Sequence, residues 1–338
     1  MDKDTVKQEI QKQIRSATSL HIAYIGVANS LFDFIQNAGS LSPDELSYSA
    51  HVDRAYAEKW LDAAYAFGYL EEENGKYSNT ELGSFFQSEI DGSMIAGAVQ
   101  AVLGGHMAER ISGLMKTGER PGENILVERP SIASLFGPML EKGFSPLFEN
   151  TILPSLHIFE EINQEKGTVL DLGCGNGWYL RSILKHFNGI KGIGIDGFSE
   201  NIRQAELRSK QDKISERTKF IEGDIFQFKP DAPVHALSMN RALHHVWDRR
   251  EIVFKNIAAF LKKGGYAVIW EPRWPDDKKD LRDPSRQGMA FQNLAEHAQG
   301  NFFLTPEQIE NQFEKAGMSA KTELFLNGNE SVIIAKKN

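Results

Sequence analysis

Cysteine is almost absent from the sequence: Cys174 is the only one in 338 residues. An internal disulfide is therefore impossible, and the composition fits a reducing compartment. Long apolar runs are also absent, and the polar start, MDKDTVKQEIQKQIR, lacks the apolar core of a secretory signal. We expect a cytoplasmic protein that has no membrane partner.

Positive charge is scarce as well. The 38 Lys and Arg residues face 46 Asp and Glu residues, which gives a formal net charge of −8. Proteins that bind nucleic acids usually need a basic surface, because their cations replace the counterions of the phosphates. We therefore expect no nucleic-acid partner. Hydrophobic residues make up 41% of the chain and charged residues 25%, as in globular proteins, and the length favours more than one domain.

Residues 1–95 are expected to form a mostly helical winged-helix domain. Residues 42–45, Ser-Pro-Asp-Glu, combine an N-cap, a first-turn proline and an acidic third position, which predicts a helix start. Apolar residues recur at helical spacing over 55–65, and Asn74-Gly75 separates two short strand-like runs, as in a hairpin. The helix before this wing has more acidic than basic residues, namely Asp53, Glu58 and Asp62 against Arg54 and Lys59. Because that charge opposes DNA binding, we interpret the domain as a dimerisation and substrate-lid module.

The rest of the chain divides at about residue 160. Residues 96–160 have helical apolar spacing, interrupted by a Gly- and Pro-rich piece, and we expect a helical linker and substrate lid there. Over 161–338, strand-like and helical patterns alternate. The expected strands cover 168–172, 192–195, 219–222, 236–239 and 266–270. This alternation predicts an α/β domain with a Rossmann-like, doubly wound parallel sheet.

A glycine-rich turn follows the first of these strands. The sequence Val-Leu-Asp-Leu-Gly-Cys-Gly-Asn-Gly over 169–177 places Gly173, Gly175 and Gly177 where backbone amides can approach a nucleotide-like ligand closely. Related loops bind nicotinamide and flavin dinucleotides, but the carboxylate of Asp171 would repel a pyrophosphate. It suits the cationic methionine end of S-adenosylmethionine (SAM), which we predict as the cofactor.

Acidic residues end the next two strands, at Asp196 and at Asp224. In order and spacing, these motifs resemble the class I SAM-dependent methyltransferases over about the last half of the chain. The resemblance implies that Asp171 serves the methionine amino group, Asp196 the ribose and Asp224 the adenine amino group. The expected cofactor site also includes Gly223, Ile225, Phe226 and Asn240.

Two adjacent histidines, His244 and His245, follow the fourth strand, where an open α/β sheet presents side chains to its ligand crevice. Together with the winged-helix domain, this pattern resembles the small-molecule O-methyltransferases of plants and bacteria. That resemblance implies that His244 deprotonates a hydroxyl group and that Glu271, just after the fifth strand, orients it. It also implies a homodimer.

A third histidine favours a different chemistry. His297 lies in a helical pattern over 291–300 that we expect to cover the substrate pocket, facing His244 and His245. Three imidazoles that leave open positions can bind zinc or iron. The constellation resembles the metal-dependent α-keto acid β-C-methyltransferases of bacterial peptide-antibiotic pathways, which belong to secondary metabolism. It implies that the three histidines hold the ion and that the substrate's keto and carboxylate oxygens complete its coordination, although some members have an aspartate at the position of His245.

Three functions remain open. The leading hypothesis is a C-methyltransferase that methylates a small α-keto acid, phenylpyruvate-like or aliphatic, through a metal-stabilised enolate. In that case Arg129 and Arg241 are candidates to neutralise the substrate carboxylate. The second is a metal-free small-molecule O-methyltransferase with His244 as general base. The third is a SAM-responsive winged-helix DNA-binding regulator, which the acidic charge opposes.

Overall fold

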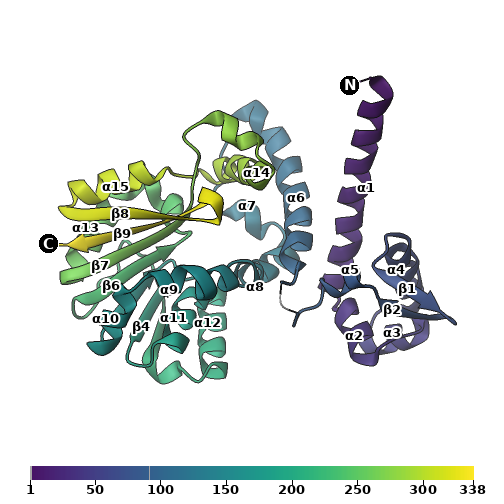
Figure 1. The fold of residues 1–338 in the computed structure, drawn as a ribbon, viewed down its shortest axis with the longest axis horizontal. Coiled ribbons are helices and arrows are strands. Elements are labelled where there is room, and N and C mark those ends of the chain that lie inside the picture. Colours follow the sequence, from purple (N-terminus) through teal and green to yellow (C-terminus); the bar gives the residue numbers. More distant parts are fainter. Residues whose placement is uncertain (1, 91) are drawn as a thin grey trace. The chain divides into compact units, whose positions relative to one another are not determined.

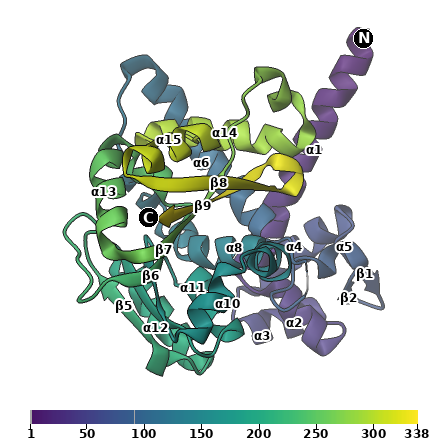
Figure 2. The same ribbon diagram turned by 60° about the vertical axis from the view of Figure 1, so that its left-hand side comes forward.

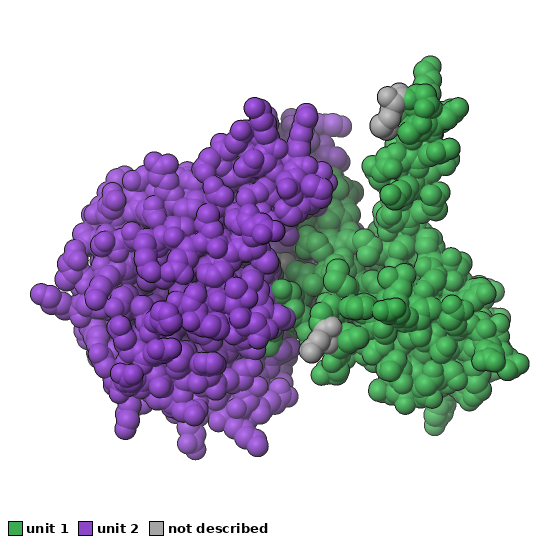
Figure 3. Space-filling model, viewed as in Figure 1, with its two compact units in different colours: residues 1–110, 130–143 green, residues 111–129, 144–338 purple. Residues whose placement is uncertain are grey.

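The chain folds into two compact units (Figure 3). In the computed structural model, the described residues are 2–90 and 92–338, and the side chains of residues 127 and 130–136 lie outside that description. Unit 1 comprises residues 1–110 and 130–143, and unit 2 comprises residues 111–129 and 144–338. Within the described residues, no helix combines the length and the apolar character needed to cross a membrane.

Unit 1 contains the predicted helices and hairpin (Figure 1). Its elements are α1 (Lys3–Ala28), α2 (Leu31–Ala38), α3 (Pro43–Ala50), α4 (Arg54–Ala66), β1 (Leu70–Glu73), β2 (Lys76–Asn79) and α5 (Glu81–Ser84). The capping box at the start of α3 is formed by Ser42 and Glu45, as the sequence predicts. In the turn between β1 and β2, Asn74 and Gly75 both have positive φ angles, +54° and +80°, which matches the twist of a two-residue hairpin.

The core of unit 1 is an aromatic cluster. Phe32 packs edge-on against Trp60, with ring centroids 5.3 Å apart, and also contacts Tyr69 and Phe86. On the surface of α4, Arg54 pairs with Asp44 and Glu58 at 2.7 Å each, and Lys59 lies 3.6 Å from Asp62. The basic side chains of the helix before the wing are therefore already engaged by carboxylates.

Two helices connect the N-terminal elements to the second unit. They are α6 (Ile95–Thr117) and α8 (Pro130–Leu147), and the short α7 (Asn124–Val127) lies between them in sequence. The unit boundaries fall inside these helices, after Arg110 in α6 and after Gly143 in α8. The segment 111–129, which includes α7, thus belongs to unit 2.

Unit 2 is built on a seven-stranded sheet, and the predicted α/β fold is confirmed. The strand order is β5-β4-β3-β6-β7-β9-β8, in which the first five are parallel and β9 is antiparallel to both of its neighbours. The bounds are β3 (Thr168–Leu172), β4 (Lys191–Asp196), β5 (Thr218–Glu222), β6 (Val234–Asn240), β7 (Leu261–Pro272), β8 (Met318–Phe325) and β9 (Glu330–Lys337). The last two strands are not predicted by the sequence analysis.

Helices cover both faces of this sheet (Figure 2). Successive residues of a strand point to opposite faces, so Val169 packs with one core cluster and Leu170 with the other. The first cluster includes side chains of α10 (Ile158–Gln164), α11 (Trp178–His186) and α12 (Ser199–Gln211). The second includes side chains of α13 (Arg250–Phe260) and α15 (Pro306–Lys315).

The remaining helical elements of unit 2 are short, apart from α14 (Pro284–Gln299). They are η1 (Phe148–Ile152), α9 (Leu153–Ser155), η2 (Ser215–Arg217), η3 (Leu243–Arg249), η4 (Lys278–Arg282) and η5 (Leu326–Gly328). Because β3 to β7 are parallel, their carboxyl ends share one edge of the sheet. In open α/β sheets this edge is where ligands bind, and the segments after β3, β4, β6 and β7 all meet there.

Candidate active site

The glycine-rich loop after β3 takes a backbone shape that other residues rarely adopt. Gly173, Gly175 and Gly177 have φ angles of +74°, +54° and +75°. A Cβ on Gly173 would lie 2.8 Å from the Cβ of Ala242, and one on Gly177 would lie 2.7 Å from the ring of Phe220. Both contacts are closer than carbon atoms tolerate, so the loop requires glycine at these positions.

Asp171 lies next to this loop and is buried, with 1% of its surface exposed. One of its carboxylate oxygens accepts a hydrogen bond of 2.8 Å from the Ser238 hydroxyl. Burial raises the pKa of Asp171 to about 7, and the nearby charge of Asp196 adds to the shift, while the Ser238 hydrogen bond opposes it. A buried carboxylate without a positive partner is stabilised in its charged form by a cationic ligand, as predicted for the methionine end of SAM.

The other predicted cofactor residues lie at neighbouring strand ends. Asp196 accepts hydrogen bonds from the backbone of Gly175 at 2.9 Å and from the side chain of Asn201 at 3.0 Å, and it thereby fixes the glycine loop. Asp224 accepts a bond of 2.8 Å from the backbone of Phe226. Gly223 donates its backbone N–H to the Asp196 carbonyl, and Ile225 packs at the edge of the second core cluster.

An unpaired acceptor supports a ligand site at this edge. The side-chain oxygen Oδ1 of Asn240, at the end of β6, is buried and has no hydrogen-bond partner among the described residues. Leaving a buried acceptor unpaired costs about 1–3 kcal/mol, so such an atom usually has a partner in the loaded protein. The glycine loop, Asp171 and this oxygen therefore fit a polar, cationic cofactor.

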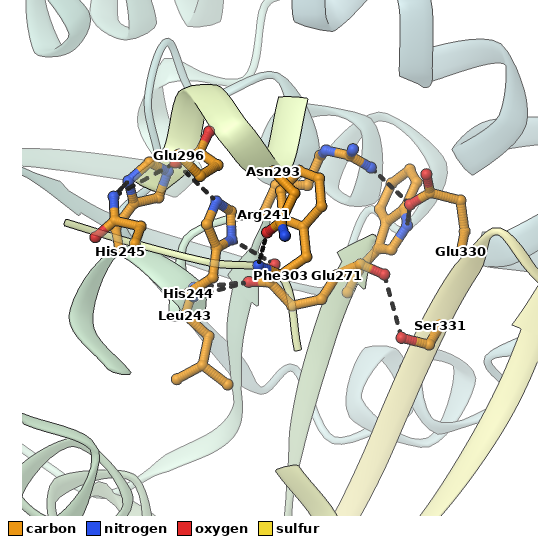
Figure 4. Close-up of polar contacts among 12 residues, drawn as sticks. Arg241, Leu243, His244, His245, Glu271, Asn293, Glu296, Phe303, Glu330 and Ser331 are labelled. Atoms are coloured by element: carbon orange, nitrogen blue, oxygen red, sulfur yellow. Dashed lines mark hydrogen bonds and ion pairs between the residues drawn. The ribbon is translucent and has the colours of Figure 1, made fainter. Parts of the chain in front are cut away.

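His244 and Glu271 form a buried pair (Figure 4). The ring nitrogen Nδ1 of His244 lies 2.6 Å from Oε2 of Glu271, and 4% and 0% of the two residues are exposed. The other Glu271 oxygen accepts a bond of 2.7 Å from the backbone of Leu243. Burial would raise the pKa of Glu271, but the charge and hydrogen bond of His244 and the charges of Arg241 and His245 outweigh it and lower that pKa. The carboxylate thus stays ionised and engages Nδ1 of His244, so that in the neutral form of the imidazole the proton is on Nδ1 and the lone pair is on Nε2.

The second nitrogen of His244 faces another carboxylate. Nε2 lies 3.9 Å from Oε2 of Glu296, which is too long for a hydrogen bond (Figure 4). The rings of His244 and His245 lie 4.1 Å apart, and one potential ligand atom from each of His244, His245 and Glu296 lies within 4.8 Å of the other two. Two imidazoles and a carboxylate at these distances are able to hold a metal ion.

This cluster contains Glu296 where the sequence analysis expects His297. Both residues are in α14, but the side chain of His297 is exposed, and the metal-capable group among the described residues does not include it. The reason is geometric: neighbouring residues of an α-helix point about 100° apart, so only one of the two can face His244. The structure brings the glutamate to the histidine pair.

His245 has two further polar neighbours. Its Nδ1 lies 3.0 Å from Oε1 of Glu123, and 2.9 Å from the side-chain nitrogen of Asn301. Burial disfavours the charged imidazole, but the hydrogen bond of Glu123 and the charges of Glu296, Glu123 and Glu271 outweigh it and raise the pKa of His245. The same hydrogen bond lowers the pKa of Glu123, against the effect of burial.

The two predicted substrate arginines have different surroundings. Arg241 donates to Oε2 of Glu330 at 2.6 Å, and its guanidinium group lies 4.0 Å from the centre of the Phe144 ring. Glu330 also accepts a bond of 2.8 Å from the Trp270 indole, so Arg241 belongs to a buried network that includes the end of β7. Arg129 is exposed at the end of the segment 111–129.

A cavity of about 540 Å³ reaches His244 from the side of α15. Its walls include the buried side chains of Trp247, Asn301 and Gln312. Two cations, Arg250 and Lys315, line it together with Asp248. A volume of this size accommodates a small molecule.

The sequence model of a methyltransferase domain family matches residues 148–322, which is just over half of the chain. The chain belongs to the class I SAM-dependent methyltransferases. The matched range contains the glycine loop, the histidine pair and the helix that carries Glu296. The residues predicted to bind the cofactor all lie within this range.

Curated relatives match this methyltransferase over shorter stretches. The sterol 24-C-methyltransferase of Pneumocystis carinii is 29% identical over 38% of the chain and 33% of its own length. The malonyl-[acyl-carrier protein] O-methyltransferase of Halalkalibacterium halodurans is 26% identical over 36% of the chain and 45% of its own length. The chain therefore spans less than half the length of these two relatives.

Solved structures match the methyltransferase over its whole length. An O-methyltransferase family protein from Burkholderia thailandensis superimposes with a TM-score of 0.75 and 18% identity, covering 100% of this chain and 99% of the other. Human N-acetylserotonin methyltransferase, in complex with SAM, gives a TM-score of 0.74 and 19% identity over 100% and 99% of the two chains. At these identities the match establishes the shared fold.

Four residues close to the histidine pair or its supports are absent from the sequence predictions, namely Glu296, Glu123, Asn301 and Glu330. Glu296 has a signal, because it adjoins His297 in the helix expected over the pocket, and the ligand role of His297 stays a prediction. Glu123 and Asn301 have none, since each comes from a segment that no motif connects to the histidines. Glu330 likewise has none, and it supports the site through Arg241.

Proposed function

We propose that this methyltransferase transfers a methyl group to the β-carbon of a small α-keto acid, and that His244, His245 and Glu296 hold a metal ion for the reaction. The observation that carries the proposal is the close approach of their three potential ligand atoms, all within 4.8 Å of one another. Two histidines and one carboxylate with open positions are the typical ligands of non-haem ferrous iron, and zinc also accepts them.

The surroundings of His244 support a ligand role. Histidine ligands usually donate their second ring N–H to a carboxylate, which fixes the tautomer and the ring orientation. Glu271 does this at 2.6 Å, so Nε2 presents its lone pair toward Glu296. Phe303 packs edge-on against the His244 ring, with centroids 5.4 Å apart, and shields that side from water.

An ion at these ligands would supply a Lewis acid for the keto oxygen, and SAM would supply the electrophilic methyl group. Asp171 would balance the positive charge at the methionine end of the cofactor. For the substrate carboxylate, Arg241 is already bonded to Glu330, whereas Arg250 and Lys315 line the cavity beside His244. We propose these two cations, together with the exposed Arg129, as partners of the carboxylate.

A second function is favoured by one specific contact. The buried bond between His244 and Glu271 is also the arrangement of a general base, in which Nε2 takes a proton from a substrate hydroxyl group. Methylation would then occur on oxygen, and His245 and Glu296 would not be needed as ligands. Several structural neighbours are O-methyltransferases, among them the mitomycin 7-O-methyltransferase.

The metal content of the purified protein distinguishes the metal-dependent C-methyltransferase from the metal-free O-methyltransferase. We would measure zinc and iron by elemental analysis in the purified wild type and in the variants His245→Ala, Glu296→Ala and His297→Ala. The proposal predicts near-stoichiometric metal in the wild type and in His297→Ala, and its loss in the other two. If His297→Ala loses the metal and Glu296→Ala keeps it, the proposed ligand set is wrong.

The product then identifies the reaction. With SAM and phenylpyruvate as the probe, nuclear magnetic resonance of the product distinguishes a new carbon-bound methyl group from a methoxy group. A metal-containing protein that methylates carbon supports the proposal. A metal-free protein that methylates only hydroxyl acceptors would instead establish His244 as a general base.

A further inference from the structure

One carboxylate of the site comes from outside the sheet and its connecting loops. Glu123 immediately precedes α7, in the segment 111–129 that joins α6 to α8 in sequence. Its Oε1 atom lies 3.0 Å from Nδ1 of His245. In this part of unit 2, α7 also packs against α14, the helix that carries Glu296.

The contact between Glu123 and His245 resembles the contact between Glu271 and His244. His244 has Nδ1 at 2.6 Å from Glu271, and His245 has Nδ1 at 3.0 Å from Glu123. A carboxylate at Nδ1 holds a proton on that nitrogen and leaves the lone pair on Nε2. Both histidines therefore have the same nitrogen engaged by a carboxylate from a distant segment.

Asn301 competes for the same atom of His245. Its side-chain nitrogen lies 2.9 Å from Nδ1 and 3.4 Å from Oε2 of Glu296, and an amide nitrogen can donate but cannot accept. The two contacts require opposite states of Nδ1, because it must carry a proton for Glu123 and lack one for Asn301. Hydrogen bonds to a charged acceptor are about twice as strong as neutral ones, so the carboxylate decides the state.

We propose that Glu123 is a positioning residue that fixes the tautomer and orientation of His245 as a ligand. Through this contact, the segment 111–129 takes part in building the site. The role in metal binding rests on the function proposed above, whereas the role in setting the tautomer of His245 does not.

The first test measures metal affinity. Cobalt(II) is titrated into the metal-free wild type and into Glu123→Gln, Glu123→Ala and Asn301→Ala, and the Kd is read from the visible absorption of the bound ion. Loss of a residue that orients a ligand typically weakens metal affinity by about 10–100-fold. We expect that loss in Glu123→Ala and a smaller one in Glu123→Gln, whose carbonyl oxygen can still accept from Nδ1.

A matched control lies in the same segment. Glu119 is exposed, and Glu119→Ala removes the same charge from the loop without touching the histidines, so its cobalt affinity should equal that of the wild type. An equal loss in Glu119→Ala would assign the effect to overall charge and overturn the proposal. Full affinity in both Glu123 variants, with a loss in Asn301→Ala, would give the positioning role to Asn301.

The second test works without any metal. In the ¹⁵N nuclear magnetic resonance spectrum of the metal-free protein, the wild type should show His245 with its proton on Nδ1, and Glu123→Ala should shift the proton toward Nε2. An unchanged tautomer overturns the proposal. If the wild type binds no cobalt but the tautomer shifts as expected, the proposed function fails while the role of Glu123 in orienting His245 is upheld.

Discussion

The cofactor loop and the histidine cluster lie at neighbouring strand ends of one sheet, but they are built in different ways. The cofactor loop is one continuous segment, residues 169–177, whose shape depends on backbone angles that glycine alone adopts easily. The cluster combines side chains from four separate segments, which contribute Glu123, the histidine pair, Glu271 and Glu296.

This difference explains how one fold can serve many acceptors. A loop that binds through its backbone is fixed by a short motif and changes little when the rest of the chain changes. A site made of side chains from several segments can change its chemistry when one segment shifts by a single residue, as the positions 296 and 297 illustrate. We therefore expect binding of the cofactor and choice of acceptor to be separable in this methyltransferase.

The largest effect should follow from a change at Glu271, which supports only the cluster. Glu271→Ala removes the acceptor of two buried donors, Nδ1 of His244 and the backbone N–H of Leu243. We expect methyl transfer to fall by about 10²–10⁴-fold and the free energy of unfolding to fall by about 3 kcal/mol. Steady-state kinetics and denaturant unfolding measure the two quantities.

Glu271→Gln is the matched variant, because it keeps the size of the side chain. Its oxygen can still accept from Leu243, but its amide cannot hold the proton of His244 as a carboxylate does. We expect a similar loss of activity with a smaller loss of stability, while the Kd for SAM, measured by calorimetry, stays within about twofold. A large loss of SAM affinity in this variant would show that the two regions are not separable.

Substitutions of two glycines in the cofactor loop test whether the loop and the histidine cluster are independent of each other. Gly177→Ala adds a Cβ 2.7 Å from the Phe220 ring, at a φ of +75° that costs about 1–2 kcal/mol for other residues, so SAM affinity should fall about 10-fold. Cobalt affinity should stay unchanged. Gly173→Ala instead adds a Cβ 2.8 Å from Ala242, two residues before His244, so both affinities should fall. An unchanged cobalt Kd in Gly173→Ala would show that the cluster is independent of the loop.

The last expected effect is a pH dependence that belongs to the cofactor region alone. The pKa of Asp171 is raised to about 7 in the ligand-free protein, so this carboxyl stabilises the fold below about pH 4 and loses that contribution as the pH rises through 7. The cationic cofactor prefers the ionised form. The affinity for SAM should therefore weaken by up to about tenfold for each pH unit below 7.

Calorimetric titration of SAM between about pH 5.5 and 8 measures this dependence, and Asp171→Asn should abolish it. Asn has a similar shape and does not ionise, so its SAM affinity should be low and nearly constant over the range. A pH dependence that persists in Asp171→Asn would assign the titration to another group.

The sequence predicts most of the fold because the relevant signals are local. The capping box at Ser42, the hairpin turn at Asn74-Gly75 and the glycine loop at 173–177 each depend on residues within one turn or one strand. Strands β8 and β9 escape prediction because they are antiparallel and end the sheet, whereas the βα alternation indicates only parallel strands. The strand propensity of residues in β8 and β9 does not reveal which strand of the sheet this final hairpin pairs with.

The site is predicted in part, for the same reason. His244 and His245 follow β6, and Glu271 lies at the end of β7, so the topology of the sheet brings them to one edge. The choice between Glu296 and His297 depends on the rotation of α14, which tertiary packing sets and no local pattern encodes. Glu123 depends on the path of a whole segment, so only the structure reveals its contact with His245.

The position of β9 has a consequence for how the enzyme is made. β9 follows β8 in the chain but lies between β7 and β8 in the sheet, so before β9 is synthesised β8 has no neighbour in the sheet and β7 has only β6. β9 also carries Glu330, which binds Arg241, and Ser331, whose hydroxyl donates to the Glu271 carbonyl at 3.2 Å. The cofactor loop, by contrast, needs only β3 and β4 as backbone partners. During translation, a growing chain would therefore be able to shape the SAM loop well before the histidine pair receives its full support.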